Sequence, residues 1–357
     1  MTSKIASLQG AWMFKPFSDY LSNKRFESLD GLRAISIIAV IWHHTAPAGT
    51  NAMLASIGAQ GVQLFFAISG FLITTLLLRE RERNGKIDLK AFYLRRSLRI
   101  FPLYYGTLAL YIILVFLLER HTAVGQAFFQ NLIYFATYTS NIFVDLDGRV
   151  IFYFAWSLAA EEQFYLVWPP LLLWAGSAGR AGAILLLVIL ACILSQLLGQ
   201  HYLDLIQLPI VLSALLAIGL NNERTFTLLY KILAQTWSAP LIFFALMLSL
   251  LSNVLPGFVS SILFATLVGS CVIRGQHSLL PLLAFKPLAY LGTISYGMYM
   301  LHMLCKNLVN KFLHLFHLDE AGIAVFLLTL LTSAILASIS FRYYESWFLA
   351  WKTRFER

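Results

Sequence analysis

Apolar stretches of membrane-crossing length recur along the whole chain of 357 residues. A helix needs about 20 apolar residues to cross a bilayer, at a rise of about 1.5 Å per residue. The pattern predicts about ten such spans, at 30–49, 59–78, 100–118, 156–175, 182–199, 206–221, 239–254, 258–273, 287–305 and 321–349. We therefore expect an all-α polytopic membrane protein, with a transmembrane domain at 29–350 between a segment at 1–28 and a tail at 351–357.

The stretch 126–143 is ambiguous, because it is apolar but rich in amides and hydroxyls. Lys and Arg are enriched in the cytoplasmic loops of membrane proteins. If 126–143 does not span, most of the 26 Lys and Arg residues fall on the side that holds both termini; otherwise they divide more evenly. We therefore expect both termini in the cytoplasm, and 126–143 as a re-entrant or interfacial piece on the outer side.

The composition agrees with a protein embedded in a lipid bilayer. Charged residues make up 12% of the chain, against roughly 25% in soluble domains. The net charge of +9 reflects basic loops rather than a nucleic-acid surface, since Lys and Arg cluster between the spans. The cysteines and histidines lack the spacing of a metal site, so we expect no metal. The first span should itself act as a signal anchor.

The first span carries ionisable groups, which are expensive in a bilayer and therefore indicate function. Arg33 and His44 are eleven residues apart, about three helical turns, so both lie on one face and are separated by roughly 16 Å. His43 points elsewhere. Asp30 lies one turn before Arg33 and could pair with it.

The third span begins with Arg96 and Arg99, which lie at i, i+3 and are adjacent on a helix. Two neighbouring guanidinium groups are good partners for phosphate. Much of the surrounding basic loop, 79–99, could equally be topogenic charge or bind anionic lipid. The pair itself indicates an anionic ligand that arrives from the cytoplasm.

Three further segments hold polar groups within apolar spans. Ser69 and Gly70 are typical of close helix packing, and the alternative is a passage for a slim ligand. The pair Glu161 and Glu162 could form a structural ion pair with Arg33, or one carboxylate could orient a histidine.

The segment near the end of the chain has two such groups, Tyr299 and His302, at i, i+3. A single histidine on an apolar face is more often a satisfied core residue than a functional one. Arg342 and Glu345 are also at i, i+3, and we expect them to pair with each other.

Five segments together resemble the membrane-bound acyltransferase-3 family. They are Leu29–Ala34 followed by His44, then 65–72, 92–104, 156–165 and 294–302, in the family's order and over most of the chain. The resemblance implies ten membrane helices and transfer of an acyl group from cytoplasmic acyl-CoA to an acceptor at or beyond the outer face. It also implies a stand-alone member without the extracytoplasmic hydrolase domain that many relatives carry.

The family's functional positions fall on residues of this chain. Its arginine–histidine pair falls on Arg33 and His44, its two spaced arginines on Arg96 and Arg99, and its key glutamate on Glu161. Gln63 stands where the family commonly has an acidic residue, which puts a charge at that position in doubt.

From this resemblance we expect an O-acyltransferase of the bacterial inner membrane that uses acetyl-CoA and a glycan or lipid-linked glycan. His44 would be the general base, with Glu161 or Asp30 orienting it. Arg33 would pair with Asp30, a phosphate or the oxyanion. The remaining roles are donor binding by Arg96, Arg99, Ser69 and Gly70, and acceptor binding by Trp156, Tyr299 and His302.

Two other functions remain open at this point. A flippase for an anionic lipid-linked sugar could use the same charged path, although no inverted repeat is visible in the sequence. An acyltransferase for a lipid or a small metabolite would differ only in its acceptor.

Overall fold

The computed structural model describes residues 14–47, 50–200, 203–252, 255–317 and 322–352, and helices account for nearly all of them. The first half contains α2 (Lys15–Ser22), α3 (Glu27–Thr45), α4 (Ala52–Ile57), the 3-10 helix η1 (Gly58–Gln60), α5 (Gly61–Asn84), α6 (Leu89–Leu118), α7 (Ala123–Gln130), α8 (Leu132–Ala136), α9 (Ser140–Phe143) and α10 (Ala155–Trp174).

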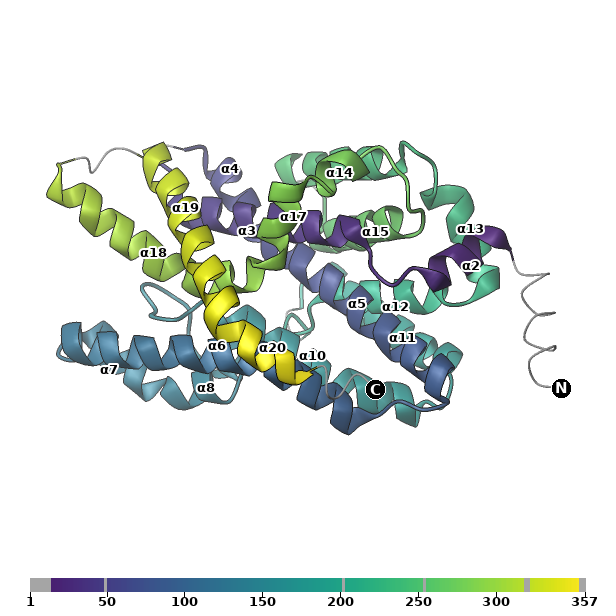
Figure 1. The fold of residues 1–357 in the computed structure, drawn as a ribbon, viewed down its shortest axis with the longest axis horizontal. Coiled ribbons are helices and arrows are strands. Elements are labelled where there is room, and N and C mark those ends of the chain that lie inside the picture. Colours follow the sequence, from purple (N-terminus) through teal and green to yellow (C-terminus); the bar gives the residue numbers. More distant parts are fainter. Residues whose placement is uncertain (1–13, 48–49, 201–202, 253–254, 318–321, 353–357) are drawn as a thin grey trace.

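The second half begins at α11 (Ala178–Leu197), followed by α12 (Leu208–Leu220), α13 (Glu223–Leu233), α14 (Ser238–Ser252), α15 (Gly257–Val272), α16 (Leu280–Leu283), α17 (Lys286–Thr293), α18 (Ser295–Leu315), α19 (Gly322–Ser340), the π-helix η2 (Phe341–Glu345) and α20 (Ser346–Lys352). Helices α3 and α6 run roughly along the longest axis of the molecule, and the run from α19 to α20 crosses that axis steeply (Figure 1). Helices α2 and α13 lie at one end of that axis, and α7 lies at the other.

Each of the ten predicted spans contains helix, but fewer helices can cross a membrane on their own. Four candidate spans among the described residues are long and apolar enough: Met53–Asn84, Leu89–Leu118, Ala178–Leu197 and Gly322–Trp351. A fifth results if Glu223–Leu233 and Ser238–Ser252, which meet at 74°, count as one broken span. The chain is therefore a helical membrane protein with at least four candidate spans, and the total of ten stays a prediction.

The other predicted spans differ from these four for identifiable reasons. Helix α12 has 13 residues and α15 has 16, which is shorter than a bilayer-crossing helix. The predicted span 287–305 is divided between α17 and α18, because Ile294 leaves the helical conformation between them. There the Ser295 hydroxyl donates to the carbonyl oxygen of Gly292 at 2.8 Å.

The ambiguous stretch 126–143 is not one continuous helix. It is divided among α7, α8 and α9, with breaks at Asn131 and at Tyr138, whose φ is 54°. This agrees with the expectation that it does not cross as a straight span. Its position on the outer side stays a prediction.

The expected pairing of Arg342 with Glu345 is wrong. The chain adopts a π-helix over Phe341–Glu345, which changes the angular spacing of side chains on the helix. Glu345 turns inward, is 8% exposed, and accepts a hydrogen bond from the Ser340 hydroxyl at 3.0 Å. Arg342 is exposed, with its guanidinium over the Tyr343 ring.

Helices α3 and α5 lie where the apolar cores of the molecule meet. There are three apolar cores. The first lies around α12 to α16, the second around α6 to α10, and the third around α10 to α12. Helix α3 contributes to the first and second cores, and α5 contributes to the first and third. The two helices approach closely at Gly61, where a Cβ atom would lie 2.4 Å from the carbonyl oxygen of Ser36. Residues on α3 and α5 are therefore held rigidly at the centre of the fold.

Helix α6 is fixed at its start and against α10. The Asp88 side chain accepts from the Ala91 backbone N–H at 2.9 Å, which caps the helix. Pro170 lacks an N–H, so the carbonyl oxygen of Leu166 loses its helical partner in α10. The Tyr93 hydroxyl of α6 donates to that oxygen at 2.9 Å.

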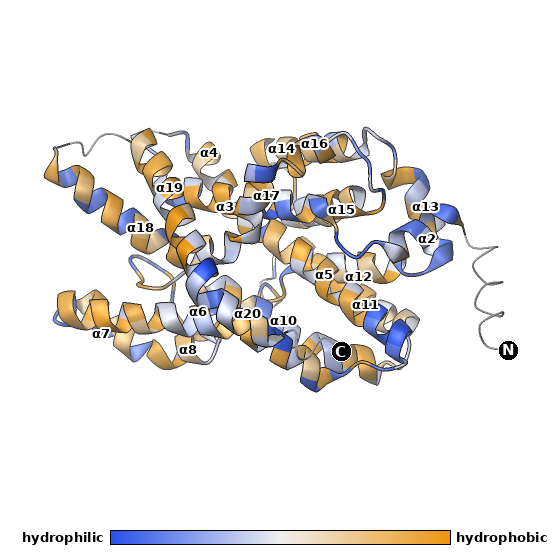
Figure 2. Ribbon diagram, in the orientation of Figure 1, coloured by the Kyte–Doolittle hydropathy of each residue, from blue (hydrophilic) through white to orange (hydrophobic). Residues whose placement is uncertain are grey.

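The surface of the helices is largely apolar (Figure 2). Large side chains such as Leu117, Leu187 and Trp174 are 69%, 67% and 80% exposed. Such exposure suits contact with lipid tails. Hydrophilic residues are prominent at the end of the molecule that holds α2 and α13 (Figure 2).

Candidate active site

Three arginines from two helices gather on one side of α3. Arg33 belongs to α3, and Arg96 and Arg99 lie one turn apart on α6. Arg99 interacts electrostatically with both Arg33 and Arg96. The sequence spacing predicted that Arg96 and Arg99 are adjacent. The approach of Arg33 results from tertiary packing of α3 near α6.

Glu161 lies at the centre of what we call the arginine cluster, which consists of Arg33, Ser69, Arg96, Arg99, Glu161 and Tyr165. Its Oε1 atom accepts a hydrogen bond from the Ser69 hydroxyl at 2.5 Å and another from the Tyr165 hydroxyl. The guanidinium carbon of Arg96 lies 4.1 Å from the centroid of the Tyr165 ring, a cation–π contact. One carboxylate therefore joins α5, α10 and, through Tyr165, α6.

Some polar atoms in and beside the arginine cluster have no hydrogen-bond partner among the described residues. The Arg96 Nε atom and the Glu162 Oε1 atom are buried without a partner among the described residues. None of the ion pairs in the described part of the chain includes Arg96 or Arg99. Because buried polar groups are nearly always paired, these atoms indicate room for a ligand, and the cations favour an anionic one.

Asp30 holds Arg33 at the edge of this cluster. Its Oδ1 atom lies 3.3 Å from Nη1 of Arg33, and its Oδ2 atom lies 2.7 Å from Nη2 of Arg25. Next to them is a cavity of about 140 Å³, whose lining includes Lys24, Arg25, Arg33 and Arg79, with Asp30 as its acidic member. The cavity is basic and too small for a whole nucleotide.

Gly70 serves helix packing rather than a passage. A Cβ atom at this position would lie 2.0 Å from the carbonyl oxygen of Ile210 in α12. The two backbones therefore touch, and a donor chain cannot pass between them. The assignment of Gly70 to donor binding is corrected on this ground, whereas its neighbour Ser69 reaches the arginine cluster.

His44, in the last turn of α3, has Tyr153 as its hydrogen-bond partner. The Tyr153 hydroxyl oxygen lies 2.8 Å from Nδ1 and 3.1 Å from Nε2 of the imidazole. The same hydroxyl donates to the Met303 sulfur at 3.8 Å. His43 turns away, with its Nδ1 atom 2.8 Å from the carbonyl oxygen of Ala55.

A second histidine stacks on the first. The rings of His44 and His302 lie 5.2 Å apart between centroids, with their planes at 25°. The Nδ1 atom of His302 lies 2.6 Å from the carbonyl oxygen of Tyr299 and must donate to it, because that oxygen can only accept. Its Nε2 atom is then a hydrogen-bond acceptor, buried and without a partner among the described residues. We call His44, Tyr153, Tyr299, His302 and Met303 the histidine cluster.

A strained turn brings Tyr153 to α3. Residues 151–154 form a turn before α10, and Phe152 in it has φ of 64°, a left-handed conformation that costs energy for a residue with a Cβ atom. The Phe152 ring is buried at 2% exposure, so packing enforces the turn. Strained backbone of this kind is often associated with functional sites.

Tyr299 is the member of the histidine cluster that also interacts with the arginine cluster. Its hydroxyl pairs with the Ser157 hydroxyl at 2.6 Å and with the carbonyl oxygen of Phe154 at 3.0 Å. It interacts electrostatically with Tyr153 of the histidine cluster and with Glu161 of the arginine cluster. A ligand that reached from one cluster to the other would pass close to Tyr299.

Comparison with known families agrees with this arrangement. The family model for the acyltransferase domain matches residues 26–342, which include every member of both clusters.

The chain belongs to the acyltransferase-3 family.

Similar proteins are known from bacteria. The chain is 29% identical to peptidoglycan O-acetyltransferase OatA of Listeria monocytogenes, over 91% of this chain and 56% of that protein. It is 28% identical to putative peptidoglycan O-acetyltransferase YrhL of Bacillus subtilis, over 89% and 54%, and to O-acetyltransferase OatA of Staphylococcus aureus, over 93% and 58%. The chain thus spans about half the length of these curated relatives. No solved structure matches it.

This family member differs from the sequence-based expectation in the partner of His44. The Glu161 carboxylate accepts hydrogen bonds from Ser69 and Tyr165, and the Asp30 carboxylate pairs with Arg25 and Arg33. Neither carboxylate hydrogen-bonds His44. The spacing along the sequence placed acids near the first and fourth spans, but it could not tell at which depth each side chain would pack.

Several site residues were missed or lie elsewhere. Tyr165 could have been found, because it lies one turn after Glu161 on the same helix. Tyr153 gave no signal, because it lies in a turn without periodicity. Trp156 packs its ring against Phe66, with centroids 6.2 Å apart, and its role in acceptor binding stays a prediction.

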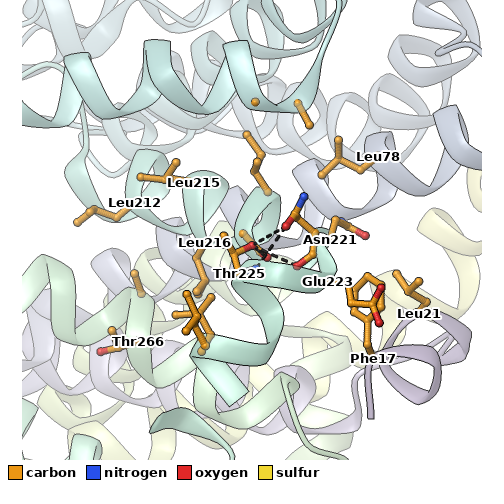
Figure 3. A pocket seen from close by; sticks show the side chains of 18 of the residues that line it. Phe17, Leu21, Leu78, Leu212, Leu215, Leu216, Asn221, Glu223, Thr225 and Thr266 are labelled. Carbon is orange, nitrogen blue, oxygen red and sulfur yellow. Dashed lines mark hydrogen bonds between the residues drawn. The ribbon is translucent and has the colours of Figure 1, made fainter. Parts of the chain in front are cut away.

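A further cavity in this family member is separate from both clusters. It has a volume of about 1010 Å³ and is lined by residues of α2, α5, α12, α13 and α15. Figure 3 shows Leu212, Leu215 and Leu216 on one side of it and Phe17 on another. None of the residues predicted from the sequence for the site lines it. Among the described residues, no group of His, Cys, Asp and Glu side chains could hold a metal ion.

Proposed function

We propose that the chain is a membrane O-acyltransferase that moves an acyl group, acetyl in the first instance, from acyl-CoA to a hydroxyl of a cell-surface or lipid-linked glycan. One observation carries this proposal: helix α3 contributes Arg33 to a cation cluster and His44, three turns later, to an imidazole–phenol cluster. Membership of the acyltransferase-3 family and the O-acetyltransferases among its relatives support it.

The donor binds through its phosphate groups at the arginine cluster. Arg99 is exposed, Arg96 has an unpartnered Nε atom, and guanidinium groups bind phosphate oxygens in pairs. The basic cavity at Lys24, Arg25 and Arg33 extends this surface. Ser69 and then Tyr299 line the route by which the thioester end reaches the histidine cluster.

The acceptor reacts at His44. The neutral imidazole takes the proton of the acceptor hydroxyl while the hydroxyl oxygen attacks the thioester carbonyl carbon. A C–O bond forms, and negative charge collects on the carbonyl oxygen. The C–S bond then breaks, and the CoA thiolate takes the proton back from His44. The products are an acyl ester and CoA with a free thiol.

One neighbour of His44 has a hydrogen-bond acceptor that the described residues leave unused. The Nε2 atom of His302 is free to accept a hydrogen bond from a second hydroxyl beside the reacting one. The names of two relatives specify peptidoglycan, which supports a glycan as the acceptor class.

We place the donor side in the cytoplasm and the chain in the bacterial inner membrane. The distribution of Lys and Arg between the loops supports cytoplasmic termini. In that orientation Arg33 lies toward the cytoplasm and His44 toward the outer face. Acyl-CoA then enters at one end of α3, and the acceptor hydroxyl arrives at the other.

The test uses membrane vesicles that contain the full chain, incubated with acetyl-CoA labelled in the acetyl group. We expect label in ester linkage on a glycan, and none with the His44→Ala variant at equal protein level. Label on lipid alone would contradict the glycan acceptor. Absence of any label with the wild-type chain would contradict acyl transfer and leave a transporter of anionic lipid-linked sugar as the explanation.

A further inference from the structure

A general base needs its second ring nitrogen to be held, so that the first one faces the substrate with its lone pair. Carboxylates usually do this, but none hydrogen-bonds His44 among the described residues. The groups that interact with His44 are the Tyr153 hydroxyl and three basic side chains, His43, His302 and Lys306. The question is which of them fixes the imidazole.

Only Tyr153 has the geometry to do so. Its hydroxyl lies within hydrogen-bond distance of the imidazole, and the two rings meet edge to face at 83° with centroids 5.5 Å apart. The Tyr153 hydroxyl must be the donor in its contact with Met303, because a thioether sulfur can only accept a hydrogen bond. When the O–H group points to Met303, the phenolic oxygen is free to accept an N–H from His44.

We propose that Tyr153, backed by Met303, is the positioning residue of His44. The hydroxyl oxygen lies 2.8 Å from Nδ1 and 3.1 Å from Nε2, so in this proposal it accepts the N–H of Nδ1, the nearer nitrogen, and Nε2 carries the lone pair that deprotonates the acceptor hydroxyl. This inference rests on the proposed function, in which His44 is the base. It replaces the carboxylate partner with a phenol–thioether pair.

The surroundings explain why a neutral partner suits this site. The basic side chains that interact with His44 are His43, His302 and Lys306, and in the proposed mechanism the imidazole rests in its neutral form. A phenol orients that neutral ring without adding an ion pair to a buried site. The strained turn at Phe152 keeps the phenol in place before any substrate arrives.

The experiment compares Tyr153→Phe with Tyr105→Phe in purified full-length protein. Tyr105 is the matched control, because its hydroxyl also donates one hydrogen bond, to the carbonyl oxygen of Ala136 at 2.9 Å. Two quantities are measured for each variant. One is kcat and KM for transfer of labelled acetyl, and the other is the rate at which diethylpyrocarbonate modifies His44 without substrate, followed by peptide mass spectrometry.

For Tyr153→Phe we expect kcat to fall about tenfold, the scale of one lost hydrogen bond, with the KM for acetyl-CoA unchanged. The modification rate of His44 should rise, because the ring nitrogen that faced Tyr153 becomes accessible. Met303→Leu should shift both quantities in the same direction by less. Tyr105→Phe should shift neither.

An unchanged kcat together with an unchanged modification rate of His44 in Tyr153→Phe overturns the proposal. If that variant does not fold, Met303→Leu decides by the same two quantities, and no change in either overturns it. Loss of transfer in the wild-type chain would instead reject the proposed function. The modification rate of His44 would still decide whether Tyr153 holds the imidazole.

Discussion

The arginine cluster and the histidine cluster share helix α3 and differ in chemistry. The first is built of full charges, with guanidinium groups around the Glu161 carboxylate. The second is built of imidazoles, phenols and a thioether, and no carboxylate hydrogen-bonds His44 among the described residues. A single helix thus presents guanidinium and carboxylate groups near its start and imidazole and phenol groups at its end.

This difference indicates a division of labour. Fixed charges suit the capture of an anionic donor, because charge-assisted hydrogen bonds to phosphate are strong and directional. Proton transfer requires the opposite, a base that is uncharged at rest. Separating the two along α3 keeps the arginines away from the imidazole.

The largest effect is expected from His44→Ala. Loss of a general base lowers the rate of transfer by about 10²–10⁴-fold. Label incorporation from acetyl-CoA measures it. His43→Ala is the control, because His43 bonds to the backbone of Ala55, and it should keep most of the activity. Equal losses of transfer activity in both variants would contradict the role of His44 as the general base.

The next effect is expected from replacing Arg96 and Arg99 together with alanine. A hydrogen bond to a charged group contributes about 1.5–3 kcal/mol, so the loss of even one such bond should raise the dissociation constant for acetyl-CoA about 10- to 100-fold. Arg95→Ala is the matched control, because Arg95 lies on the same helix and pairs with Glu80 at 2.8 Å. Binding that is equally weak in the control would show a general effect of loop charge.

A smaller effect on stability is expected from Gly70→Ala. The new Cβ atom would overlap the carbonyl oxygen of Ile210, and overpacking of this kind costs about 1–3 kcal/mol. Thermal unfolding in detergent measures it. Gly179→Ala, where the added atom meets nothing within 4 Å, should leave the midpoint unchanged. An unchanged midpoint of thermal unfolding, together with weaker binding of acetyl-CoA in Gly70→Ala, would support a passage for the donor at this position.

The smallest effect on the imidazole is expected from Glu161→Gln. The amide oxygen can still accept a hydrogen bond from Ser69 or Tyr165, but the charge beside Arg96 is lost. Transfer should fall modestly, and the modification rate of His44 by diethylpyrocarbonate should stay at the wild-type value. A rise in that modification rate, as expected for Tyr153→Phe, would indicate that Glu161 helps to orient His44.

Much of the helix pattern could be predicted from the sequence. Apolar runs located every long helix, because burial and lipid contact both require them. The break at Ile294 and the π-helix at Phe341–Glu345 could not be predicted, since no proline marks either position in the sequence. The number of spans could not be settled either, because helices such as α12 are short.

The site was predictable where function depends on one helix. The i, i+3 spacing found Arg96 beside Arg99, and the eleven-residue spacing separated His44 from His43. Contacts between helices were not predictable. Whether Glu161 or Asp30 contacts His44 was left open, and in the structure Glu161 contacts Ser69 instead. Tyr153 was missed, because its position depends on the backbone conformation of Phe152.

The most direct test of the division between the two clusters is the affinity of the purified His44→Ala variant for acetyl-CoA, measured by isothermal titration calorimetry. The division predicts a dissociation constant equal to that of the wild-type chain, although transfer is lost. A dissociation constant raised as far as in the variant without Arg96 and Arg99 would contradict it, because His44 would then belong to the donor site.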